Sequence, residues 1–484
     1  MDKSDGLKQL NGRTEASGAK KSCARGRLEL LLDGASLVEL GRYFEQAGMV
    51  PGYECASEPG EGVVAGVGAV DGRPVYVFAQ DVSVLAGSMS GGQAEKIVRV
   101  LELAERNGSP VVCVLDSGGS RVAEGAAAVG AYNRVIKKMT ELSGLVPTVA
   151  VVAGPCIGAG AMLAAAADFT VAVNGSVLGL HSPQVLAAAG AEAQASARAV
   201  CAKGLAQFYA EDEAGAFALV RRLLSFLPQN NLDEAAAADG PDDPDRQIPE
   251  LDAGETPGAR ELIAMIADAG QFLELYATYG QSMVTGFIRL NGYTAGVVAN
   301  AGGFAPDACR KAARFISLLD AYHLPVLTLA DAGDIQPGPQ EAEMAAALPS
   351  LLYAYSQATT PMVTMITGKA VGAGLLAMCP RSAGADIVYA WANAEISALP
   401  AETAALIVYG DEIKKADDPV AARQGAIVKY MNKEATAFEA ARQGVVDEVI
   451  APSASRQMAV YALEACASKR AAITPPKKHG VAPL

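Results

Sequence analysis

The chain has 484 residues, more than a single hydrophobic core usually supports, so its length predicts two domains. Hydrophobic residues make up 51% and charged residues 19%, the composition of an ordinary packed globular protein that is rich in Ala and Gly. The formal net charge of −14 argues against a general nucleic-acid-binding surface, although a few local Lys and Arg residues would suffice for an anionic ligand.

Several kinds of site and segment are not expected. The eight Cys residues include no C-x-x-C pair, and the polar, basic residues 1–26 lack the apolar core of a signal peptide, so we expect a reducing cytoplasmic location. His181, His323 and His479 are far apart in the sequence, and no metal site is predicted. The sequence also lacks the G-x-S-x-G motif of many serine hydrolases.

An uncharged stretch at residues 145–167 is long enough to span a bilayer. However, Pro and Gly residues interrupt it, its first third alternates like a strand, and a similar run occurs at residues 361–378. A buried strand, turn and helix therefore explains the stretch better than a membrane span, and we expect a soluble protein.

The first half alternates strand and helix signals. Residues 24–44 predict an amphipathic helix, a turn at Asp33-Gly34 and a second short element. Two β-rich runs follow from Glu61, and the Asp71-Gly72 dipeptide between them predicts a hairpin. Apolar residues at helical spacing then predict a helix at residues 91–108. The short runs VVCVL and PTVAVVA predict buried strands, and the alternation indicates an α/β fold.

The second half repeats the first. Its MVTGFIRLNGYTAGVVAN run echoes the first hairpin, with Asn291-Gly292 at the turn. Residues 229–260 between the halves are acidic and rich in Pro and Gly, which predicts a linker. We therefore divide the chain into a polar lead (1–26), an N-terminal domain (27–228), this linker and a C-terminal domain (261–484).

The duplication is clearest at two glycine turns in each half. The first half reads VVCVLDSGGSR around Asp116 and GPCIGAGAML from Gly154, which lies 38 residues after that Asp. The second half reads VLTLADAGDIQ around Asp331 and GKAVGAGLLA from Gly368, which lies 37 residues after that Asp. Each copy reads as an apolar strand, a glycine turn and a helix of small residues, so we infer two homologous domains.

Backbone amides at such turns point their N–H groups outward and stabilise developing negative charge, and two of them form an oxyanion hole. The candidate donors are Gly119, Ser120, Gly158 and Ala159 in the first half and Gly333, Asp334, Gly372 and Ala373 in the second. Any one of these turns is more simply explained by close helix–sheet packing, but four turns in matched pairs favour function. No acid–base constellation stands out, which suits enolate formation at a thioester carbonyl.

These residues resemble a known family, the acyl-CoA carboxyltransferase subunits of the crotonase superfamily. That family includes propionyl-CoA carboxylase β subunits, the transcarboxylase core subunit and methylmalonyl-CoA decarboxylase α subunits. The resemblance runs from about Ala24 to Leu484. The motifs that carry it are RLELLLDGASLVEL, PGEGVVAGVG, VYVFAQD, LDSGGSR, SGLVPTVAVVAGPC, LLYAYSQATTPMVTMITGKA, YAWANAEIS and KKHGVAPL.

The resemblance implies two tandem crotonase-like ββα-superhelical domains and a biotin-dependent reaction. The N-terminal turn would hold the acyl-CoA thioester and the C-terminal turn would hold carboxybiotin. Four residues beside the turns would contact these ligands: Gly118, Arg121, Lys369 and Gly374. An ion pair is at least as good an explanation of Arg121, whereas the position of Lys369 slightly favours a functional role.

The resemblance also implies partners. No lysine stands in an A-M-K-M context, so biotin would arrive on a separate carrier protein. The expected assembly is a homo-hexamer, a dimer of trimers, that works with a biotin carboxylase or with membrane decarboxylase subunits. The expected location is the cytoplasm, with attachment to the inner membrane through such subunits as an option.

The second half departs from the family pattern. The family reads D-V-P-G-F where this chain has residues 331–335, so the carboxylate of Asp334 would face a carboxylated biotin unfavourably unless it turns away. Two family tyrosines are replaced by Val371 and Leu375. Neutral drift and a changed substrate or lost biotin step both explain these departures. The alternative functions are a non-catalytic docking subunit and a biotin-independent crotonase-type acyl-CoA enzyme.

Overall fold

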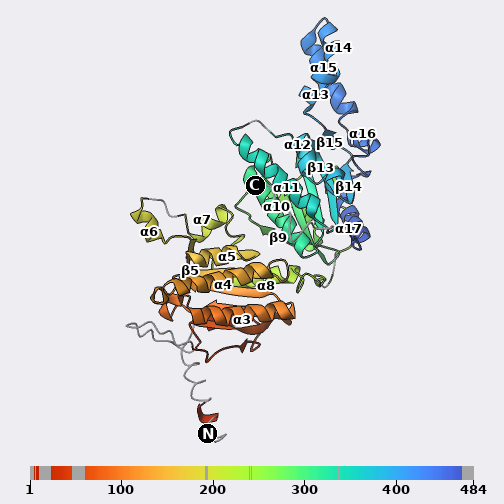
Figure 1. Cartoon of the computed structure of the whole chain (residues 1–484). Coiled ribbons are helices and arrows are strands. Elements are labelled where there is room, and N and C mark those ends of the chain that lie inside the picture. The colour runs from red at the N-terminus through yellow and green to blue at the C-terminus, as the bar shows by residue number, and fades with distance from the viewer. Residues whose placement is uncertain are drawn as a thin grey trace. The chain divides into compact units, whose positions relative to one another are not determined.

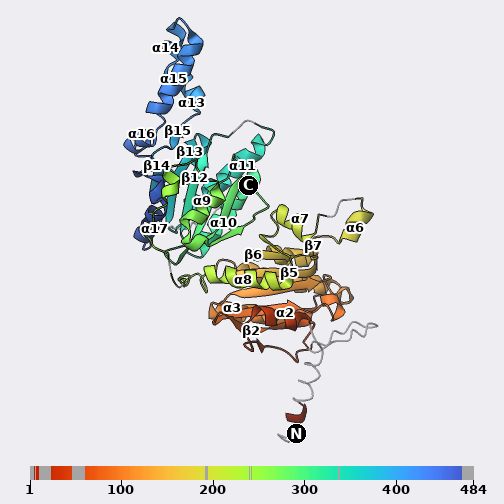
Figure 2. The same cartoon turned by 180° about the vertical axis from the view of Figure 1, so that it is seen from behind.

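The computed structural model forms two compact units, Met1–Glu234 and Ala235–Leu484 (Figures 1 and 2). It describes Asp5 and residues 7–9, 23–45, 60–190, 194–238, 240, 242–335 and 338–470. Most of the predicted N-terminal lead and the KKHGVAPL motif lie outside the described residues. We call the two bodies unit 1 and unit 2.

Unit 1 contains a mixed sheet whose strands are β1 (Val38–Glu39), β2 (Val63–Val70), β3 (Arg73–Gln80), β4 (Val111–Ser117), β5 (Thr148–Ile157), β6 (Phe169–Val173), β7 (Val177–Gly179) and β8 (Phe208–Ala210). Their order is β1-β2-β3-β4-β5-β6-β8, and β7 pairs with β5 beside this path. The pairs β1–β2 and β2–β3 are antiparallel, and the remaining pairs are parallel.

The helices of unit 1 are α2 (Cys23–Leu31), α3 (Gly91–Asn107), α4 (Ala126–Leu142), α5 (Ala159–Ala165), α6 (Pro183–Ala188), α7 (Ala197–Ala202) and α8 (Glu213–Phe226), with 3₁₀ turns η1 (Leu85–Gly87) and η2 (Val122–Glu124). α3 and α4 cover one face of the sheet, and α2 and α8 cover the other (Figures 1 and 2). The predicted helix at 91–108 is confirmed: Ser90 caps its start and the left-handed Gly108 ends it.

Unit 2 contains a second mixed sheet whose strands are β9 (Phe272–Leu275), β10 (Met283–Leu290), β11 (Tyr293–Asn300), β12 (Val326–Ala332), β13 (Met362–Val371), β14 (Ile387–Trp391), β15 (Glu395–Ser397) and β16 (Glu448–Ile450). Their order is β9-β10-β11-β12-β13-β14-β16, and β15 pairs with β13. The strand order of unit 1 is thus repeated strand for strand, which confirms the predicted α/β duplication.

The helices of unit 2 are α9 (Ala259–Ile266), α10 (Pro306–Ala321), α11 (Glu341–Gln357), α12 (Ala373–Ala377), α13 (Ala401–Val408), α14 (Gly410–Lys415), α15 (Pro419–Lys433), α16 (Ala437–Arg442) and α17 (Ser455–Cys466), with 3₁₀ turns η3 (Pro249–Asp252), η4 (Asp268–Gly270), η5 (Arg381–Ala383) and η6 (Pro452–Ala454). α10 and α11 cover one face of this sheet, and α9 and α17 cover the other (Figures 1 and 2). α13, α14 and α15 form an arm with a small core of its own, centred on Ala405, Tyr409 and Tyr430.

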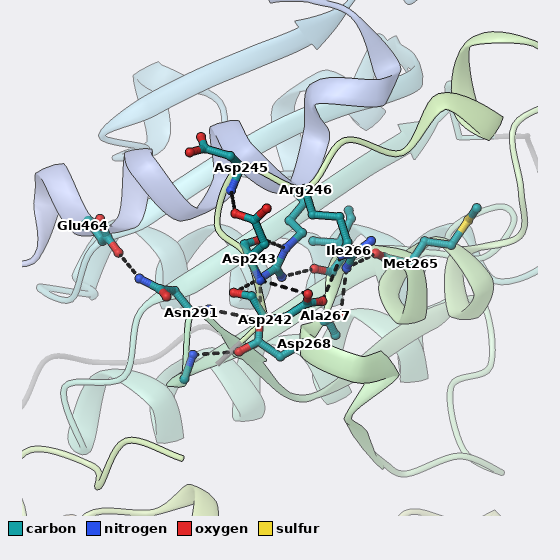
Figure 3. A network of polar contacts seen from close by, with 12 residues as sticks. Asp242, Asp243, Asp245, Arg246, Met265, Ile266, Ala267, Asp268, Asn291 and Glu464 are labelled. Carbon is teal, nitrogen blue, oxygen red and sulfur yellow. Dashed lines mark hydrogen bonds and ion pairs between the residues drawn. The ribbon is translucent and has the colours of Figure 1, made fainter. Parts of the chain in front are cut away.

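Part of the predicted linker is tied to unit 2. The fully buried guanidinium of Arg456 donates hydrogen bonds to the main-chain oxygens of Asp242, Asp243 and Ile266. Figure 3 shows this region, where Arg246 also binds the Asp242 carboxylate at 2.9 Å. The acidic passage therefore folds against unit 2 instead of running free.

The uncharged stretch at residues 145–167 forms β5, a turn and α5, as predicted. Within the part of the chain that the structure describes, no helix combines the length and apolar character needed to cross a membrane. Five of the described cysteines are buried among apolar side chains, as expected for small hydrophobic residues: Cys113, Cys156, Cys201, Cys309 and Cys379.

Candidate functional site

We call the two glycine turns of unit 1 together the first turn, and those of unit 2 together the second turn. The first turn lies at the carboxyl ends of two neighbouring parallel strands. β4 and β5 end at Ser117 and Ile157, and Ser117 pairs with Cys156 in the sheet register. The residues after both strands therefore meet at one sheet edge. A side chain added to Gly119 would come within 3.9 Å of the Ile157 carbonyl oxygen. Positive φ angles at Gly119 (113°) and Gly158 (64°) shape the turn.

Some of the predicted donors in the first turn are already engaged. The N–H of Gly119 donates to Ser117 Oγ at 3.1 Å, and the N–H of Gly158 donates to the Gly179 oxygen at 3.0 Å. Within the described residues, the N–H groups of Ser120, Ala159 and Gly160 have no partner. Ser120 and Ala159 therefore remain as predicted donors, and Gly160 joins them, while Gly119 and Gly158 set the shape of the turn.

A buried ion pair between Arg27 and Asp116 packs against Gly154, near the end of β5 and next to the first turn. The Asp116 carboxylate is 2.7 Å from Arg27 of α2, and the Asp116 side chain lies directly beneath Gly154. A Cβ on Gly154 would come within 2.2 Å of Asp116 Oδ1, so only glycine fits there. Sequence reasoning missed Arg27. The glycine that follows the strand-end Asp by 38 residues in the first half and by 37 in the second was a usable signal for the contact between Asp116 and Gly154, but not for Arg27.

Arg121, predicted as a CoA contact, is instead buried within the turn. Its residue is 8% exposed, and its guanidinium lies 3.4 Å from Glu61 and 3.7 Å from Glu124. It also donates to the main-chain oxygen of Ser88 at 3.3 Å. The structure therefore supports the ion-pair interpretation of Arg121. Its neighbour Gly118 is exposed, with its N–H bonded to the Ala86 oxygen.

The second turn repeats this frame. β12 and β13 pair at Ala332 and Ala370, and Gly372 (φ 55°) donates its N–H to the Ser397 oxygen at 3.0 Å. Gly374 packs so tightly that an added Cβ would lie 2.3 Å from the Ala332 oxygen. Gly333, which directly follows the end of β12, is exposed.

Lys369 lies at the exposed side of the second turn. Its side chain is 61% exposed, and its ammonium is 3.3 Å from the Glu395 carboxylate. Its backbone N–H donates to Asp331 Oδ1 at 2.8 Å. The equivalent position in unit 1 is Pro155, which has no N–H, and Asp116 Oδ1 is accordingly buried without a partner in the part of the chain that the structure describes.

Asp334 occupies the second turn itself. Its Oδ1 accepts the N–H of Ala373 at 3.1 Å and the N–H of Ile335 at 2.9 Å. A Cβ on Gly372 would lie 2.6 Å from the same oxygen. Ala373 was predicted as a donor for a ligand, but its amide is bonded to this carboxylate. Asp334 was predicted as a backbone donor that a ligand would use, and what the structure shows is its side chain accepting hydrogen bonds within the turn.

The titratable groups around the turns do not suggest acid–base catalysis. Burial raises the pKa of the Cys156 thiol, next to the first turn, to about 12, so this thiol is protonated and unreactive near neutral pH. Burial also raises the pKa of Tyr132, whose hydroxyl is 3.2 Å from Ser117 Oγ. No cluster of His, Cys, Asp and Glu suited to a metal ion occurs among the described residues.

Trp391, the one tryptophan of the chain, and His181, one of its three histidines, lie in different environments. Trp391 is 1% exposed in the core of unit 2 and donates its indole N–H to Ser455 Oγ at 2.8 Å, so it packs in the core. His181 is exposed in the loop after β7.

Comparisons with known proteins identify the frame. The family model described as carboxyl transferase domain matches residues 17–482. The methylmalonyl-CoA carboxyltransferase 12S subunit of Propionibacterium freudenreichii subsp. shermanii is 38% identical, over 95% of this chain and 91% of the relative. The methylmalonyl-CoA decarboxylase subunit alpha of Propionigenium modestum is 36% identical, over 99% and 96%. The propionyl-CoA carboxylase beta chain of Saccharopolyspora erythraea is 38% identical, over 96% and 91%.

A solved structure agrees with these relatives. The transcarboxylase 12S structure with methylmalonyl-coenzyme A and methylmalonic acid bound superposes with a TM-score of 0.94 at 36% identity, covering 100% of this chain and 99% of the other. This match confirms the predicted pair of tandem crotonase-like domains. With the duplicated sheets, the paired turns and the near full-length matches together, the chain belongs to the carboxyl transferase domain family.

Proposed function

We propose that this chain is the carboxyltransferase subunit that moves a carboxyl group between a malonyl-type acyl-CoA and biotin on a separate carrier protein. The observation that carries the proposal is a set of N–H groups at the first turn, those of Ser120, Ala159 and Gly160, that have no partner among the described residues. They belong to the ends of neighbouring strands, which is the arrangement that an oxyanion hole needs.

The first turn supplies the chemistry of the acyl-CoA step. When the bond between the α-carbon and its carboxylate breaks, the electron pair moves into the thioester and leaves negative charge on the carbonyl oxygen. N–H groups such as those of Ser120 and Ala159 would stabilise that enolate, and each such donor is typically worth about 10² to 10³ in kcat. The same donors assist the reverse reaction, in which the enolate carbon attacks a carboxyl group.

The relatives support methylmalonyl-CoA and propionyl-CoA as the substrate pair. Methylmalonyl-CoA carboxyltransferase, methylmalonyl-CoA decarboxylase and propionyl-CoA carboxylase all carry one of these thioesters in their names. A transcarboxylase 12S structure has methylmalonyl-CoA bound. The buried, unreactive Cys156 is consistent with catalysis by backbone amides alone.

Biotin fits the second turn poorly as the turn stands. An amide that a ureido oxygen would need, that of Ala373, is bonded to the Asp334 carboxylate. We therefore assign no step to the second turn. Of the predicted contacts there, Lys369 has the exposure that a carrier-bound ligand would require, whereas Gly374 is buried.

We further propose a hexamer, located in the cytoplasm, that recruits a biotin carrier and either a biotin carboxylase or membrane decarboxylase subunits. The transcarboxylase 12S relative assembles as a hexamer. Equivalent residues of α5 and α12, Met162 and Leu376, are 54% and 55% exposed beside the two turns. Exposed apolar side chains at both turns are favourable where another subunit covers them.

The proposal is tested by carboxyl exchange with the full chain. Methylmalonyl-CoA labelled with ¹⁴C in its free carboxyl group is incubated with the protein and a biotinylated carrier domain, and label on the carrier is measured. We expect transfer that depends on the protein and on biotin. Absence of transfer in both the natural chain and an Asp334→Gly variant would reject the proposed function.

A second candidate function is a non-catalytic docking subunit of such a complex. The contact of Asp334 with Ala373 favours it, because an occupied second turn cannot serve a ligand at the same time. This candidate predicts carrier binding without transfer of label, so the same exchange experiment distinguishes the two.

A further inference from the structure

One difference between the two turns lies two residues after the paired strand positions. Gly119 follows Ser117 by two residues, and Asp334 follows Ala332 by two residues, where Ser117 and Ala332 occupy equivalent places in the two sheets. The first turn therefore has a hydrogen atom where the second has a carboxymethyl group. This comparison within one chain points to the effect of that side chain, and the Asp334→Gly variant described below isolates it.

The effect is visible at the following helix. Next to Gly158, the nearest atom to an added Cβ is the Leu180 oxygen at 3.9 Å, so the turn is open. Next to Gly372, it is Asp334 Oδ1 at 2.6 Å, so the turn is filled. The amide of Ala159 is correspondingly free within the described residues, whereas that of Ala373 has a carboxylate partner.

We propose that Asp334 is an internal occupant of the C-terminal turn, which admits a carbonyl ligand only when that ligand displaces the Asp334 carboxylate. Asp334 then determines which ligands unit 2 accepts. For the ligand's identity, the ureido group of biotin, the inference rests on the proposed function. The occupancy itself rests on the contacts of Asp334 alone.

The hydrogen bonds of the Asp334 carboxylate are strong enough to compete with a ligand for the turn, and a suitable ligand can still displace the carboxylate. Two amides donate to its Oδ1, and hydrogen bonds to a charged acceptor are among the stronger ones in proteins. Its residue is only partly buried, and no described Lys or Arg forms an ion pair with it. The Asp334 carboxylate is therefore bound as an anion is at a pair of backbone amides, and not as a member of a buried ion pair.

The consequence is selection by charge and by competition. A neutral carbonyl ligand must replace a charged acceptor with a weaker one, which lowers its affinity by about tenfold or more. A carboxylated ligand also meets the negative charge of Asp334 at close range, which adds repulsion. Unit 2 therefore binds biotin and carboxybiotin more weakly than an open turn would.

The test compares three full-length variants by calorimetry. Asp334→Gly copies the residue of the first turn, and Asp334→Asn keeps the size of the side chain but removes its charge. Glu402→Gln, on exposed α13, is the control for the loss of one negative charge. Biotin is titrated into each protein, and methylmalonyl-CoA is titrated separately as a check on unit 1.

We expect Asp334→Gly to bind biotin at least about tenfold more tightly than the natural chain, with Asp334→Asn in between and Glu402→Gln unchanged. Methylmalonyl-CoA affinity should be the same in all four proteins. Equal biotin affinity in the natural chain and Asp334→Gly would overturn the proposal. Equal biotin affinities together with label transfer would leave the proposed function intact. Tighter biotin binding by Asp334→Gly, with no label transfer by either protein, would reject only the proposed function.

A second measurement needs no ligand and guards against a variant that folds poorly. Hydrogen exchange of the Ala373 amide is measured in the natural chain and in Asp334→Gly, because an Asn side chain would keep an oxygen that can accept the same hydrogen bond. Because the carboxylate protects this amide, we expect exchange at least about tenfold faster in the variant. Equal exchange rates in the two folded proteins would overturn the proposal.

Discussion

The Asp268 carboxylate and the Arg456 guanidinium are 2.7 Å apart and join the start of unit 2 to its last helix. Asp268 also accepts the N–H groups of Asn291 and Gly292, so the pair fixes the predicted hairpin turn (Figure 3). Unit 1 has the same device. Its members are Asp33 and Arg221, 2.9 Å apart, with the turn at Asp71 and Gly72.

The two Arg–Asp pairs differ in burial, so we predict different effects for the same substitution in each pair. Arg456 is 0% exposed, whereas Arg221 is 28% exposed. Replacing Arg456 by Met leaves the buried Asp268 carboxylate without its cation and removes the side-chain donor to three main-chain oxygens, so we expect a loss of about 3–5 kcal/mol in unfolding free energy. Arg221→Met should lose clearly less, because water can solvate Asp33. Urea unfolding of both variants checks this, and equal losses would contradict it.

A buried lysine on equivalent helices leads to a prediction about pH. Lys311 of α10 donates to the main-chain oxygens of Tyr276, Tyr279 and Met283, as Lys96 of α3 does to those of Gly60 and Val63. Burial lowers the pKa of Lys311 to about 8. At pH 7 we expect Lys311→Met to lose about 2 kcal/mol, because three oxygens lose their donor.

The pH dependence follows from the direction of that pKa shift. Between pH 8 and the usual lysine pKa of about 10.5, the unfolded chain binds more protons at this site than the folded chain does. The stability of the natural chain relative to Lys311→Met should therefore rise across this window, by up to about 3 kcal/mol. Urea midpoints of both proteins at pH 7 and pH 10 measure the difference. A constant difference would mean that the pKa of Lys311 is the same in the folded and the unfolded chain.

The glycine beneath each turn leads to a third prediction. An added Cβ would lie 2.2 Å from Asp116 Oδ1 at Gly154 and 2.3 Å from Asp331 Oδ1 at Gly368. Asp116 is held by Arg27 and cannot move away, whereas Asp331 is exposed. We expect Gly154→Ala to lose about 2–3 kcal/mol in thermal unfolding and Gly368→Ala to lose less than half of that. Similar losses would show that Asp331 is fixed as firmly as Asp116.

A fourth prediction concerns catalysis at the first turn. Gly158 has φ 64° and ψ −123°, which suits glycine alone, and it positions the Ala159 amide, which has no partner among the described residues. We expect Gly158→Ala to lower kcat for carboxyl exchange by about 10²-fold. The control is Gly72→Ala, which also has positive φ (75°) and open space but lies in the hairpin at the opposite sheet edge. Unchanged kcat in Gly158→Ala would remove the first turn from the mechanism.

Local patterns predicted the elements well because their causes are local. The Asp71-Gly72 and Asn291-Gly292 turns, the α3 helix and the paired glycine turns all follow from residues within a few positions of one another. The duplication was visible for the same reason. Each turn motif is short and occurs twice with nearly the same spacing.

Long-range partners could not be predicted in this way. Arg27 meets Asp116 across 89 positions, and Arg221 meets Asp33 across 188. No periodicity links such residues, because the sheet brings them together only after it forms. Arg121 shows the same limit. A cation after a glycine turn suggests a phosphate ligand, but its buried carboxylate partner Glu61 lies 60 positions away.

Two units with the same strand order raise a question of pairing during folding, because a strand of one repeat could pair beside the equivalent neighbour in the other repeat. Synthesis on the ribosome resolves it. All strands of unit 1, including the edge strand β8 that ends at Ala210, leave the ribosome before β9 begins at Phe272. The first sheet can therefore close before a competing strand exists. Refolding the whole chain from denaturant loses this order and exposes both sets of strands to exchange at once.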